Sequence, residues 1–425
     1  MDTMQADPNP TATTPDRPQP AGASGPRIAS LDFIRGVAVM GILAANIVAF
    51  GQPFAAYTYP GAFLTEHDRA ADLMWVAQFV LIDGKMRALF TLLFGAGLYL
   101  FLEKAWEKGS GIRLQVGRLL WLGLFGAAHF VFLWKGDILL LYASCGLVAL
   151  LFVRMEPPNQ LILGLIGYII GALIYLGAAW SMEAANSGTF LPAGEQASDL
   201  QQSMLDTKQR NLDDSLADAA PIIAGDYPAF VSSNLEGLGQ GLLSWLETLP
   251  LMLVGMALYR MGFFEGAFAR RKLIFWGLVG IIGGGLVQLW IAWRALEDGL
   301  TYYGTLAAFT GWALFPRLAM SLGLLALLTV IGSRGPGWLH GRIAAAGRAA
   351  FTNYLGTSIL MLFVFHGWAL GLFGKLTRGE LYLVVLATWA IMLLWSKPWL
   401  DRFRYGPFEW LWRCLTYGRI FALRR

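Results

Sequence analysis

Apolar runs of about 20 residues recur along the chain and are separated by short polar connections. The hydrocarbon core of a bilayer is about 30 Å thick and a helix rises about 1.5 Å per residue, so each run is long enough to cross a membrane. The pattern predicts about ten crossings, over residues 31–50, 86–102, 119–133, 138–153, 160–180, 240–259, 273–293, 303–331, 350–372 and 380–396. The predicted fold class is therefore all-α, a polytopic integral membrane helical bundle.

Composition supports this prediction. Hydrophobic residues make up 56% of the 425 residues and charged residues 14%, whereas a soluble protein carries about a quarter charged residues. The two cysteines, Cys145 in an apolar span and Cys414 in the basic C-terminal tail, do not indicate a disulfide framework.

Basic residues gather in alternate connections between the predicted spans. By the positive-inside rule, the side that carries them is the cytoplasm, which places both termini inside. The basic groups are Lys104, Lys108, Arg113 and Arg118; Arg260, Arg270, Arg271 and Lys272; Arg334, Arg342 and Arg348; and, in the tail, Lys397, Arg402, Arg404, Arg413, Arg419, Arg424 and Arg425.

The same pattern divides the chain into five segments. Residues 1–26 are expected to be a disordered tail, because their composition cannot bury a core. Residues 27–180 and 240–396 carry the transmembrane helices, and residues 397–425 form a basic cytoplasmic tail. Residues 181–239 hold nine acidic side chains against two basic ones and fall outside. This acidic segment is interpreted either as a solvated linker with some helix or as a lid or acceptor-docking element.

The stretch from Asp68 to Leu102 is too long for one straight crossing and is interrupted by Asp83, Gly84, Lys85 and Arg87. A separate crossing at residues 68–83 would reverse the charge pattern. We therefore expect an additional helix there that lies along the outer face or is re-entrant. Irregular backbone at membrane depth is tolerated only when protein covers it or it lines a wet cavity. The three charged residues are expected to line a cavity rim or to form a salt-bridged kink.

Five polar residues fall inside predicted spans: Arg35, Asn46, His129, Asn353 and His366. Ionisable residues at membrane depth are functional candidates, because they are costly when unpaired. Arg35 follows Asp32 by one turn, so it either forms a local ion pair or binds an anion from the cytoplasm. Asn46 lies three turns further along and is either structural or substrate-binding.

His129 and Asp137 flank a tight connection, Trp134 to Gly136, between two predicted spans. The two side chains are therefore expected to converge. Asp137 could simply cap the following helix, and His129 could be a packing residue. In the functional interpretation, the carboxylate fixes the tautomer of a neutral imidazole that accepts a proton or an acyl group.

Five blocks of sequence resemble the YeiB-like bacterial inner-membrane proteins. They are RIASLDFIRGVAVMGILAAN (27–46), DGKMRALFTLLFGAGLYL (83–100), GDILLLYASCGL (136–147), GRAAFTNYL (347–355) and FRYGPFEWLWRCLTYG (403–418). The last two blocks resemble that family's C-terminal domain of unknown function. The resemblance covers nearly all the chain after the tail and implies a multi-pass protein of the bacterial inner membrane.

The opening LDFIRG also resembles the wider transmembrane acyltransferase superfamily. That group includes the lysosomal heparan-glucosamine N-acetyltransferase and the bacterial O-acyltransferases that modify surface polysaccharides. The resemblance implies an acyl-CoA donor bound from the cytoplasm and an acceptor reached from outside. Asn46 stands near the place where the O-acyltransferases usually carry a catalytic histidine. His67 lies in an ordinary polar context, so His129 is the preferred replacement.

The expected function is transfer of an acyl group, most simply acetyl, from cytoplasmic acyl-CoA to an extracytoplasmic or envelope acceptor such as a glycan. His129 is the expected base or acyl carrier and Asp137 its partner; Arg35, Arg342 and Arg348 are candidates for the phosphates of CoA. Substrate-binding candidates are Asn46, Asp83, Lys85 and Asn353. Membrane lipid is an expected partner, and the sequence does not decide whether the protein forms a homodimer. Neither a metal nor a nucleic acid is expected. The alternatives are a transporter or exporter of a small solute and a non-catalytic relative.

Overall fold

The computed structural model describes residues 28–425 except 67, 188–194, 239–241 and 335–336, so the predicted tail at 1–26 and His67 lie outside the described residues. Within them the fold is helical, with a single isolated β-bridge between Phe403 and Arg424. The first half holds α1 (Ala29–Gly51), α2 (Arg69–Leu81), α3 (Lys85–Trp106), α4 (Ile112–Phe132), α5 (Leu139–Ala149), α6 (Pro157–Ser187), α7 (Glu195–Ala224) and α8 (Tyr227–Glu236). The second half holds α9 (Trp245–Arg260), α10 (Arg270–Glu297), α11 (Tyr302–Ala307), α12 (Leu314–Gly332), α13 (Trp338–Arg348), α14 (Ala350–Phe365), α15 (Arg378–Arg402) and α16 (Pro407–Tyr417).

The prediction of a polytopic helical membrane protein is confirmed. Each of the ten predicted crossings coincides with a helix. By length and composition, seven helical stretches among the described residues can cross a bilayer, or eight if the bent pair α13–α14 is one span. The count is lower than the predicted ten because α5 and α9 have only 11 and 16 residues. Helices α6 and α10 expose most of their apolar side chains on the outside of the bundle, as lipid-facing helices do.

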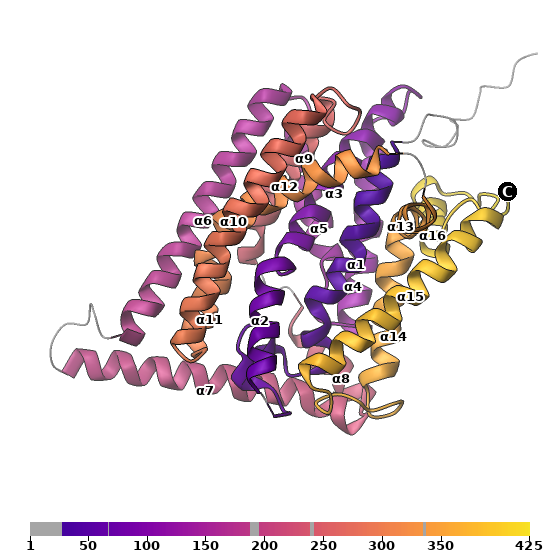
Figure 1. The fold of residues 1–425 in the computed structure, drawn as a ribbon. Helices are drawn as coiled ribbons and strands as arrows, with labels where there is room; N and C mark the ends of the chain where they lie inside the picture. Colours follow the sequence, from indigo (N-terminus) through magenta and orange to yellow (C-terminus); the bar gives the residue numbers. More distant parts are fainter. Residues whose placement is uncertain (1–27, 67, 188–194, 239–241, 335–336) are drawn as a thin grey trace, which may run out of the picture.

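The basic connections gather at one end of the bundle, called here the basic end (Figure 1). There the Ser30 hydroxyl, at the start of α1, donates to the Phe264 carbonyl in the α9–α10 connection at 3.0 Å. Trp412 of α16 donates to the Arg118 carbonyl near the start of α4 at 2.9 Å. The opposite end, called the α7 end, holds the end of α1 and the start of α11. The predicted alternation of charge is thus matched by the placement of the helices.

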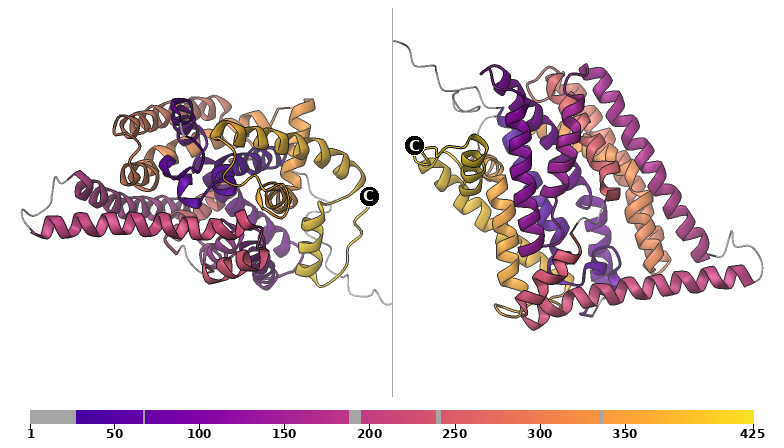
Figure 2. Two further views of the ribbon diagram at one scale, coloured as in Figure 1. Left: turned by 90° about the horizontal axis from the view of Figure 1, so that it is seen from below. Right: turned by 180° about the vertical axis from the view of Figure 1, so that it is seen from behind.

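The acidic segment forms a long helix, α7, that lies across the α7 end of the bundle (Figure 2). The Ser215 hydroxyl of α7 accepts from the Ala55 amide at 2.9 Å, and Asp218 forms an ion pair with Lys135 in the α4–α5 connection. The hydroxyl of Tyr303, in α11, donates to the Met204 carbonyl at 2.7 Å. Three contacts therefore hold α7 across this end of the bundle, and the choice between a linker and a lid stays a prediction.

Helix α2 is the additional helix expected at 68–83, ahead of the span at 86–102. It continues into α3, so that Arg69–Trp106 counts as one candidate span by length and composition. The break is at Gly84, whose φ of 74° is a left-handed conformation that glycine adopts without strain. Buried polar groups replace the lost helical hydrogen bonds around it. Lys85 donates to the Phe79 carbonyl at 2.5 Å, and the Gln78 amide donates to Asp83 at 3.2 Å.

Helix α1 lies at the centre of the bundle and contacts α3, α12, α13, α14 and α15. Its approach to α13 depends on two glycines. A Cβ on Gly36 would lie 2.0 Å from the Ile343 carbonyl oxygen, and one on Gly347 would lie 1.9 Å from that of Asp32. The first half of the chain contacts the second throughout, because α9 packs between α3 and α6. The predicted groups 27–180 and 240–396 therefore share one bundle.

Candidate active site

His129 and Asp137 converge as predicted. His129 is in the last turn of α4, and Asp137 precedes α5 after the tight Trp134–Gly136 connection. The His129 Nδ1 lies 2.9 Å from the Asp137 Oδ1, and both side chains are almost completely buried. The other oxygen of Asp137 accepts the Leu140 amide at 2.7 Å, so the carboxylate also caps α5. The Asp137 side chain thus caps α5 and also contacts His129.

A third residue, Ser358 of α14, completes the arrangement. Its Oγ lies 2.8 Å from the Nε2 of His129, on the opposite side of the ring from Asp137. The sequence carries no signal for this contact, because Ser358 stands 229 residues from His129 within an apolar run. The order Asp137, His129, Ser358 is that of a carboxylate–imidazole–hydroxyl triad, although the close contact between His129 Nδ1 and Asp137 Oδ1 does not have hydrogen-bond geometry.

Tyr354, one turn before Ser358 in α14, lies beside this triad. Its ring centroid is 5.0 Å from that of His129, and its hydroxyl accepts the Ile138 amide at 3.3 Å. Tyr354 also lines a cavity that reaches toward the basic end. It is therefore the side chain between that cavity and His129.

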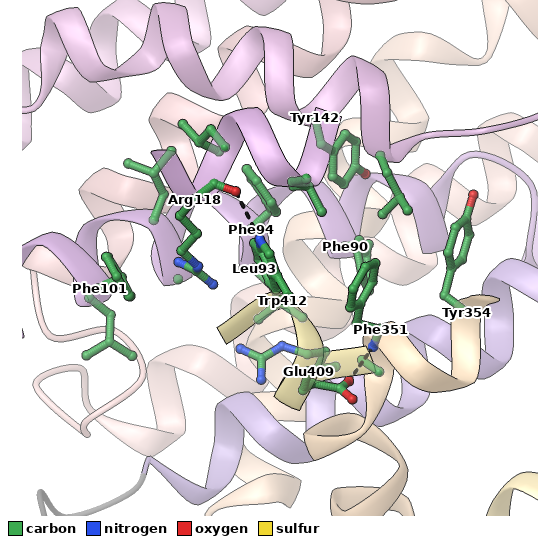
Figure 3. A pocket seen from close by; sticks show the side chains of 18 of the residues that line it. Phe90, Leu93, Phe94, Phe101, Arg118, Tyr142, Phe351, Tyr354, Glu409 and Trp412 are labelled. Carbon is green, nitrogen blue, oxygen red and sulfur yellow. Dashed lines mark hydrogen bonds between the residues drawn. The ribbon is translucent and has the colours of Figure 1, made fainter. Parts of the chain in front are cut away.

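This inner cavity has a volume of about 320 Å³, and Figure 3 shows Phe101 and Arg118 at one end of it and Tyr142 and Tyr354 at the other. Leucine and phenylalanine side chains of α3 and α4 line its interior, and Tyr142 and Tyr354 close it. Its cationic residues are Arg35, Lys104, Arg118 and Arg348. Arg35 and Arg348 were predicted as anion-binding residues; Lys104 and Arg118 were assigned only to a basic loop. Arg35 also pairs with Asp32 at 3.3 Å, the local pair expected from the sequence.

The amphipathic helix α16 closes one side of the inner cavity. The Arg118 guanidinium lies between the rings of Phe101 and Trp412, at 4.4 and 4.2 Å from their centroids. Glu409 accepts the amides of Phe351 and Thr352 at 2.8 and 3.1 Å, at the start of α14. Burial raises the pKa of Glu409 above its ordinary value, although these hydrogen bonds oppose the shift. The tail thus fixes the helix that carries Tyr354 and Ser358.

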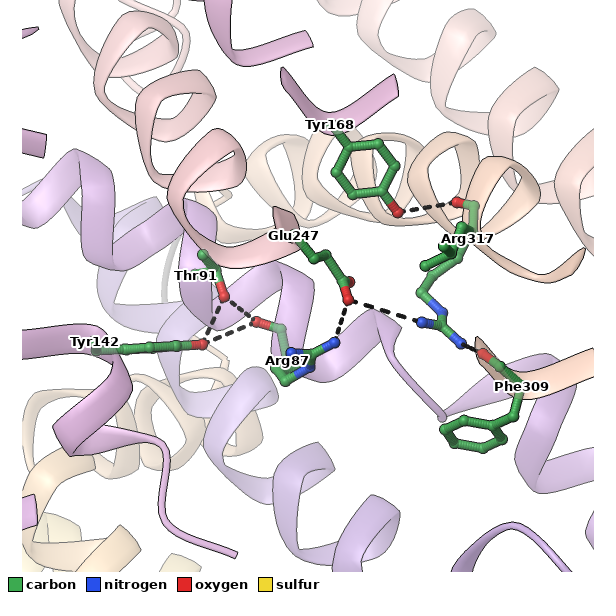
Figure 4. A network of polar contacts seen from close by, with 8 residues as sticks. Arg87, Thr91, Tyr142, Tyr168, Glu247, Phe309 and Arg317 are labelled. Atoms are coloured by element: carbon green, nitrogen blue, oxygen red, sulfur yellow. Dashed lines mark hydrogen bonds and ion pairs between the residues drawn. The ribbon is translucent and has the colours of Figure 1, made fainter. Parts of the chain in front are cut away.

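An outer cavity of about 340 Å³, toward the α7 end, reaches Asp137 of the triad, whereas His129 and Ser358 line neither this cavity nor the inner one. Asn46 and Asp137 line it, together with Arg87, Glu247 and Arg317. Glu247 pairs with Arg87 and lies 4.0 Å from Arg317, which also donates to the Phe309 carbonyl at 2.8 Å (Figure 4). The Tyr142 hydroxyl contacts Thr91 at 2.6 Å and donates to the Arg87 carbonyl at 3.2 Å. A single layer of side chains therefore separates the two cavities.

Four predicted site residues lie elsewhere. Asp83 and Lys85 stabilise the break between α2 and α3, and neither lines the outer cavity. Arg342 donates to the Leu393 carbonyl at 2.8 Å and stacks on Trp338, away from the inner cavity. Asn353 donates to the Ala346 carbonyl at 3.0 Å and accepts from Trp395 at 2.9 Å. All four contribute to helix packing in the structure, and the sequence does not distinguish this from ligand binding.

Two further histidines do not join the triad. His366 follows α14 and packs edge-on against Phe230, with 4.7 Å between ring centroids. His340 stacks on Phe33 at the basic end, at 4.6 Å. Within the described parts of the chain, no group of three or more His, Cys, Asp or Glu residues is placed to hold a metal ion.

Comparison with known proteins assigns the family. The Escherichia coli (strain K12) protein named uncharacterized protein YeiB is 31% identical over 425 residues, which cover 92% of this chain and 96% of that protein. The chain belongs to the YeiB-like family. A Bacillus subtilis (strain 168) relative, uncharacterized protein YxaH, is 29% identical over 92% of this chain and 94% of its own length. An uncharacterized 39.9 kDa protein from Bacillus acidopullulyticus is 27% identical over 93% of this chain and 96% of its own length.

A family model described as a protein of unknown function (DUF418) matches residues 258–419. In this YeiB-like chain the matched region runs from the end of α9 through α16. It therefore includes Ser358, Tyr354, Arg348 and Trp412, which lie at the triad and at the inner cavity. His129 and Asp137 precede it, so the candidate site is built from both halves of the chain. No solved structure matches the chain.

Proposed function

We propose that the protein is a membrane acyltransferase that moves an acyl group from acyl-CoA to an extracytoplasmic acceptor. The observation that supports this is the buried Asp137–His129–Ser358 triad, which is reached by the outer cavity at Asp137 and is separated from the inner cavity by the ring of Tyr354. The inner cavity extends toward the basic end and the outer cavity toward the opposite end. Two substrates on opposite sides of a membrane can meet only at such an internal site.

The inner cavity has the chemistry that acyl-CoA requires. Its cations Arg35, Arg118 and Arg348 are placed near the mouth, where guanidinium groups bind phosphate with two parallel hydrogen bonds. Its apolar interior suits the pantetheine arm and the acyl chain. A thioester bound in this direction would end at Tyr142 and Tyr354. The ring of Tyr354 must then move, because it lies between that end of the cavity and His129.

The residues of the triad account for each proton in the transfer. An acceptor hydroxyl attacks the thioester carbonyl carbon while its proton passes to His129 Nε2 through the Ser358 hydroxyl, which contacts that nitrogen. Asp137 stabilises the imidazolium that forms. The carbon–sulfur bond then breaks, and the same proton leaves with the CoA thiol. By a two-step route, His129 would itself carry the acyl group before the acceptor arrives. Ser358 relays the proton in the first route and gives up its contact with Nε2 when the imidazole carries the acyl group in the second.

The proposal requires the basic end to face the cytoplasm. The positive-inside rule predicts this orientation, and it places α7 outside. A cysteine at exposed Asp206 of α7 should react with an impermeant thiol reagent on intact cells, in a background without Cys145 and Cys414. A cysteine at exposed Ser333, at the basic end, should react only after permeabilisation. Labelling of the Ser333 variant alone on intact cells would contradict the orientation.

Binding of CoA tests the inner cavity. Arg35→Ala and Arg348→Ala should each weaken CoA binding by about tenfold or more, equivalent to about 1.4 kcal/mol, because each removes a phosphate-binding cation. Arg342→Ala is the matched control, since Arg342 lies at the same end but is directed to the Leu393 carbonyl. Calorimetry on purified protein measures all three. If the wild-type protein does not bind CoA, the acyltransferase proposal is rejected.

A transporter is the second candidate. Two cavities that approach from opposite ends and are separated by Tyr142 and Thr91 are also what an alternating-access carrier needs. The two proposals differ in one measurable respect. A carrier moves its solute without consuming a thioester, whereas an acyltransferase releases free CoA in proportion to modified acceptor.

A further inference from the structure

The outer cavity has a charge pattern that the triad does not use. Four charged side chains line it: Arg87, Arg317, Glu247 and Asp137. Asp137 is paired with His129, so Glu247 alone serves two guanidinium groups. Guanidinium groups stay protonated inside proteins. With His129 neutral, Asp137 balances the charge of the cavity as a whole, but on the Glu247 side two guanidinium groups share one contacting carboxylate. A shared counter-ion at membrane depth leaves that side able to bind a further anionic group.

Arg87 is the cation that faces the cavity space. Although it lies deep in the bundle, 31% of its side-chain surface is accessible, compared with 4% for Arg317. One nitrogen of Arg87 pairs with Glu247. Its accessible surface belongs to the outer cavity, which it lines. An anion that enters the cavity can therefore reach a guanidinium without displacing Glu247.

Glu247 supplies a second recognition group. Its Oε2 serves both arginines, while its Oε1 is buried and has no hydrogen-bond partner among the described residues. A buried acceptor without a donor costs about 1–3 kcal/mol, so a ligand hydroxyl that donates to it would be stabilising. The phenol of Tyr57 also lines the cavity. Burial, and then the charge of Asp83, raise the pKa of Tyr57 above its ordinary value, so it remains a donor at neutral pH.

We infer that the outer cavity binds a polyhydroxylated acid, with its anionic group at Arg87 and Arg317 and one hydroxyl at Glu247. The aromatic side chains of Trp134, Tyr57 and Tyr175 provide flat apolar surfaces around these polar groups. A further hydroxyl at the Asp137 side would lie next to the triad. This inference rests on the proposed function for the role of the ligand as acyl acceptor. The class of ligand follows from the cavity alone.

Three sugars with the same ring hydroxyls test the class of ligand: glucose, glucuronate and glucose 6-phosphate. Each is titrated calorimetrically into the purified full-length protein. One charge-assisted contact should make the acidic sugars bind at least about tenfold tighter than glucose. The ratio between glucuronate and glucose 6-phosphate then distinguishes a carboxylate from a phosphate ligand. Equal binding of all three, tighter binding of glucose, or no binding of either acid would overturn the inference.

Variants locate the binding site. Arg87→Gln should remove the preference for the acidic sugars, because Arg87 is the accessible cation of the cavity, whereas Arg294→Gln, in an exposed ion pair with Glu297, should keep it. Ala49→Phe fills the cavity without removing a charge and should abolish binding of all three sugars. Preference retained in both Arg87→Gln and Ala49→Phe would place the acid elsewhere and overturn the inference. If the protein binds the acidic sugars selectively but does not bind CoA, the acyltransferase proposal is rejected. The inferred class of ligand for the outer cavity is then still supported.

Discussion

His129→Ala is expected to reduce acyl transfer by about a hundredfold to ten-thousandfold, the range that general-base catalysis contributes. In the proposed reaction the imidazole is the group of the triad that takes the acceptor's proton and returns it to the leaving thiol. CoA binding should be unchanged, because the cations of the inner cavity lie toward the basic end. Release of free thiol from acetyl-CoA with an acidic sugar as acceptor measures the rate, and calorimetry measures CoA binding.

Two variants separate catalysis from folding. His129→Gln retains a side chain that can hydrogen-bond Ser358 but cannot act as a base, so it should be as inactive as alanine while melting closer to the wild type. His366→Ala is the matched control, since His366 is also buried but lies outside both cavities. A folded His129→Gln protein with the wild-type rate would show that His129 is not the base. Asp137→Asn should also lose activity, because an amide stabilises an imidazolium poorly.

The convergence of His129 and Asp137 was predictable because it is local. Seven residues and a tight connection separate them, so the end of one helix and the start of the next fix their relation. Ser358 was not predictable in this way. It reaches His129 only because α14 packs beside α4, and a serine in an apolar helix has the same local signature whether it bonds its own backbone or a distant imidazole. Hydrophobic length determines where helices occur, but not which helix faces are in contact.

The same limit applies to the charged residues at membrane depth. Arg87 was assigned to a cavity rim from the sequence and does line a cavity, but its counter-ion Glu247 lies 160 residues away. Asp83 and Lys85 have the same spacing signal as Arg87, yet their neighbours are the polar groups of a helix break. Arg342 and Arg348 occupy one short helix, and only the orientation of α13 decides that Arg348 lines the inner cavity. Side-chain direction follows from tertiary packing, which no periodicity in the sequence reveals.

Glu247→Ala is expected to destabilise the protein by about 3–5 kcal/mol, the cost of removing one partner from a buried ion pair. Glu247 is buried, and its carboxylate is the counter-ion of both Arg87 and Arg317. Its loss would leave two guanidinium groups facing each other without a negative charge between them. Thermal melting in detergent measures the effect. Asp401→Ala is the control, because its pair with Lys397 is half-exposed and surface pairs contribute about 0–1 kcal/mol.

A double variant distinguishes loss of the carboxylate from loss of its packing. Arg87→Leu with Glu247→Leu removes one charge of each sign, so Arg317 remains as the single cation and the two new side chains fill part of the vacated volume. Replacement of a buried pair by apolar residues of similar volume is often neutral or stabilising. The double variant should therefore melt at a higher temperature than Glu247→Ala. If both variants melt at the same lowered temperature, Glu247 stabilises the bundle through its packing rather than as a counter-ion. An unchanged melting temperature in Glu247→Ala would mean that Arg87 and Arg317 are compensated by another group.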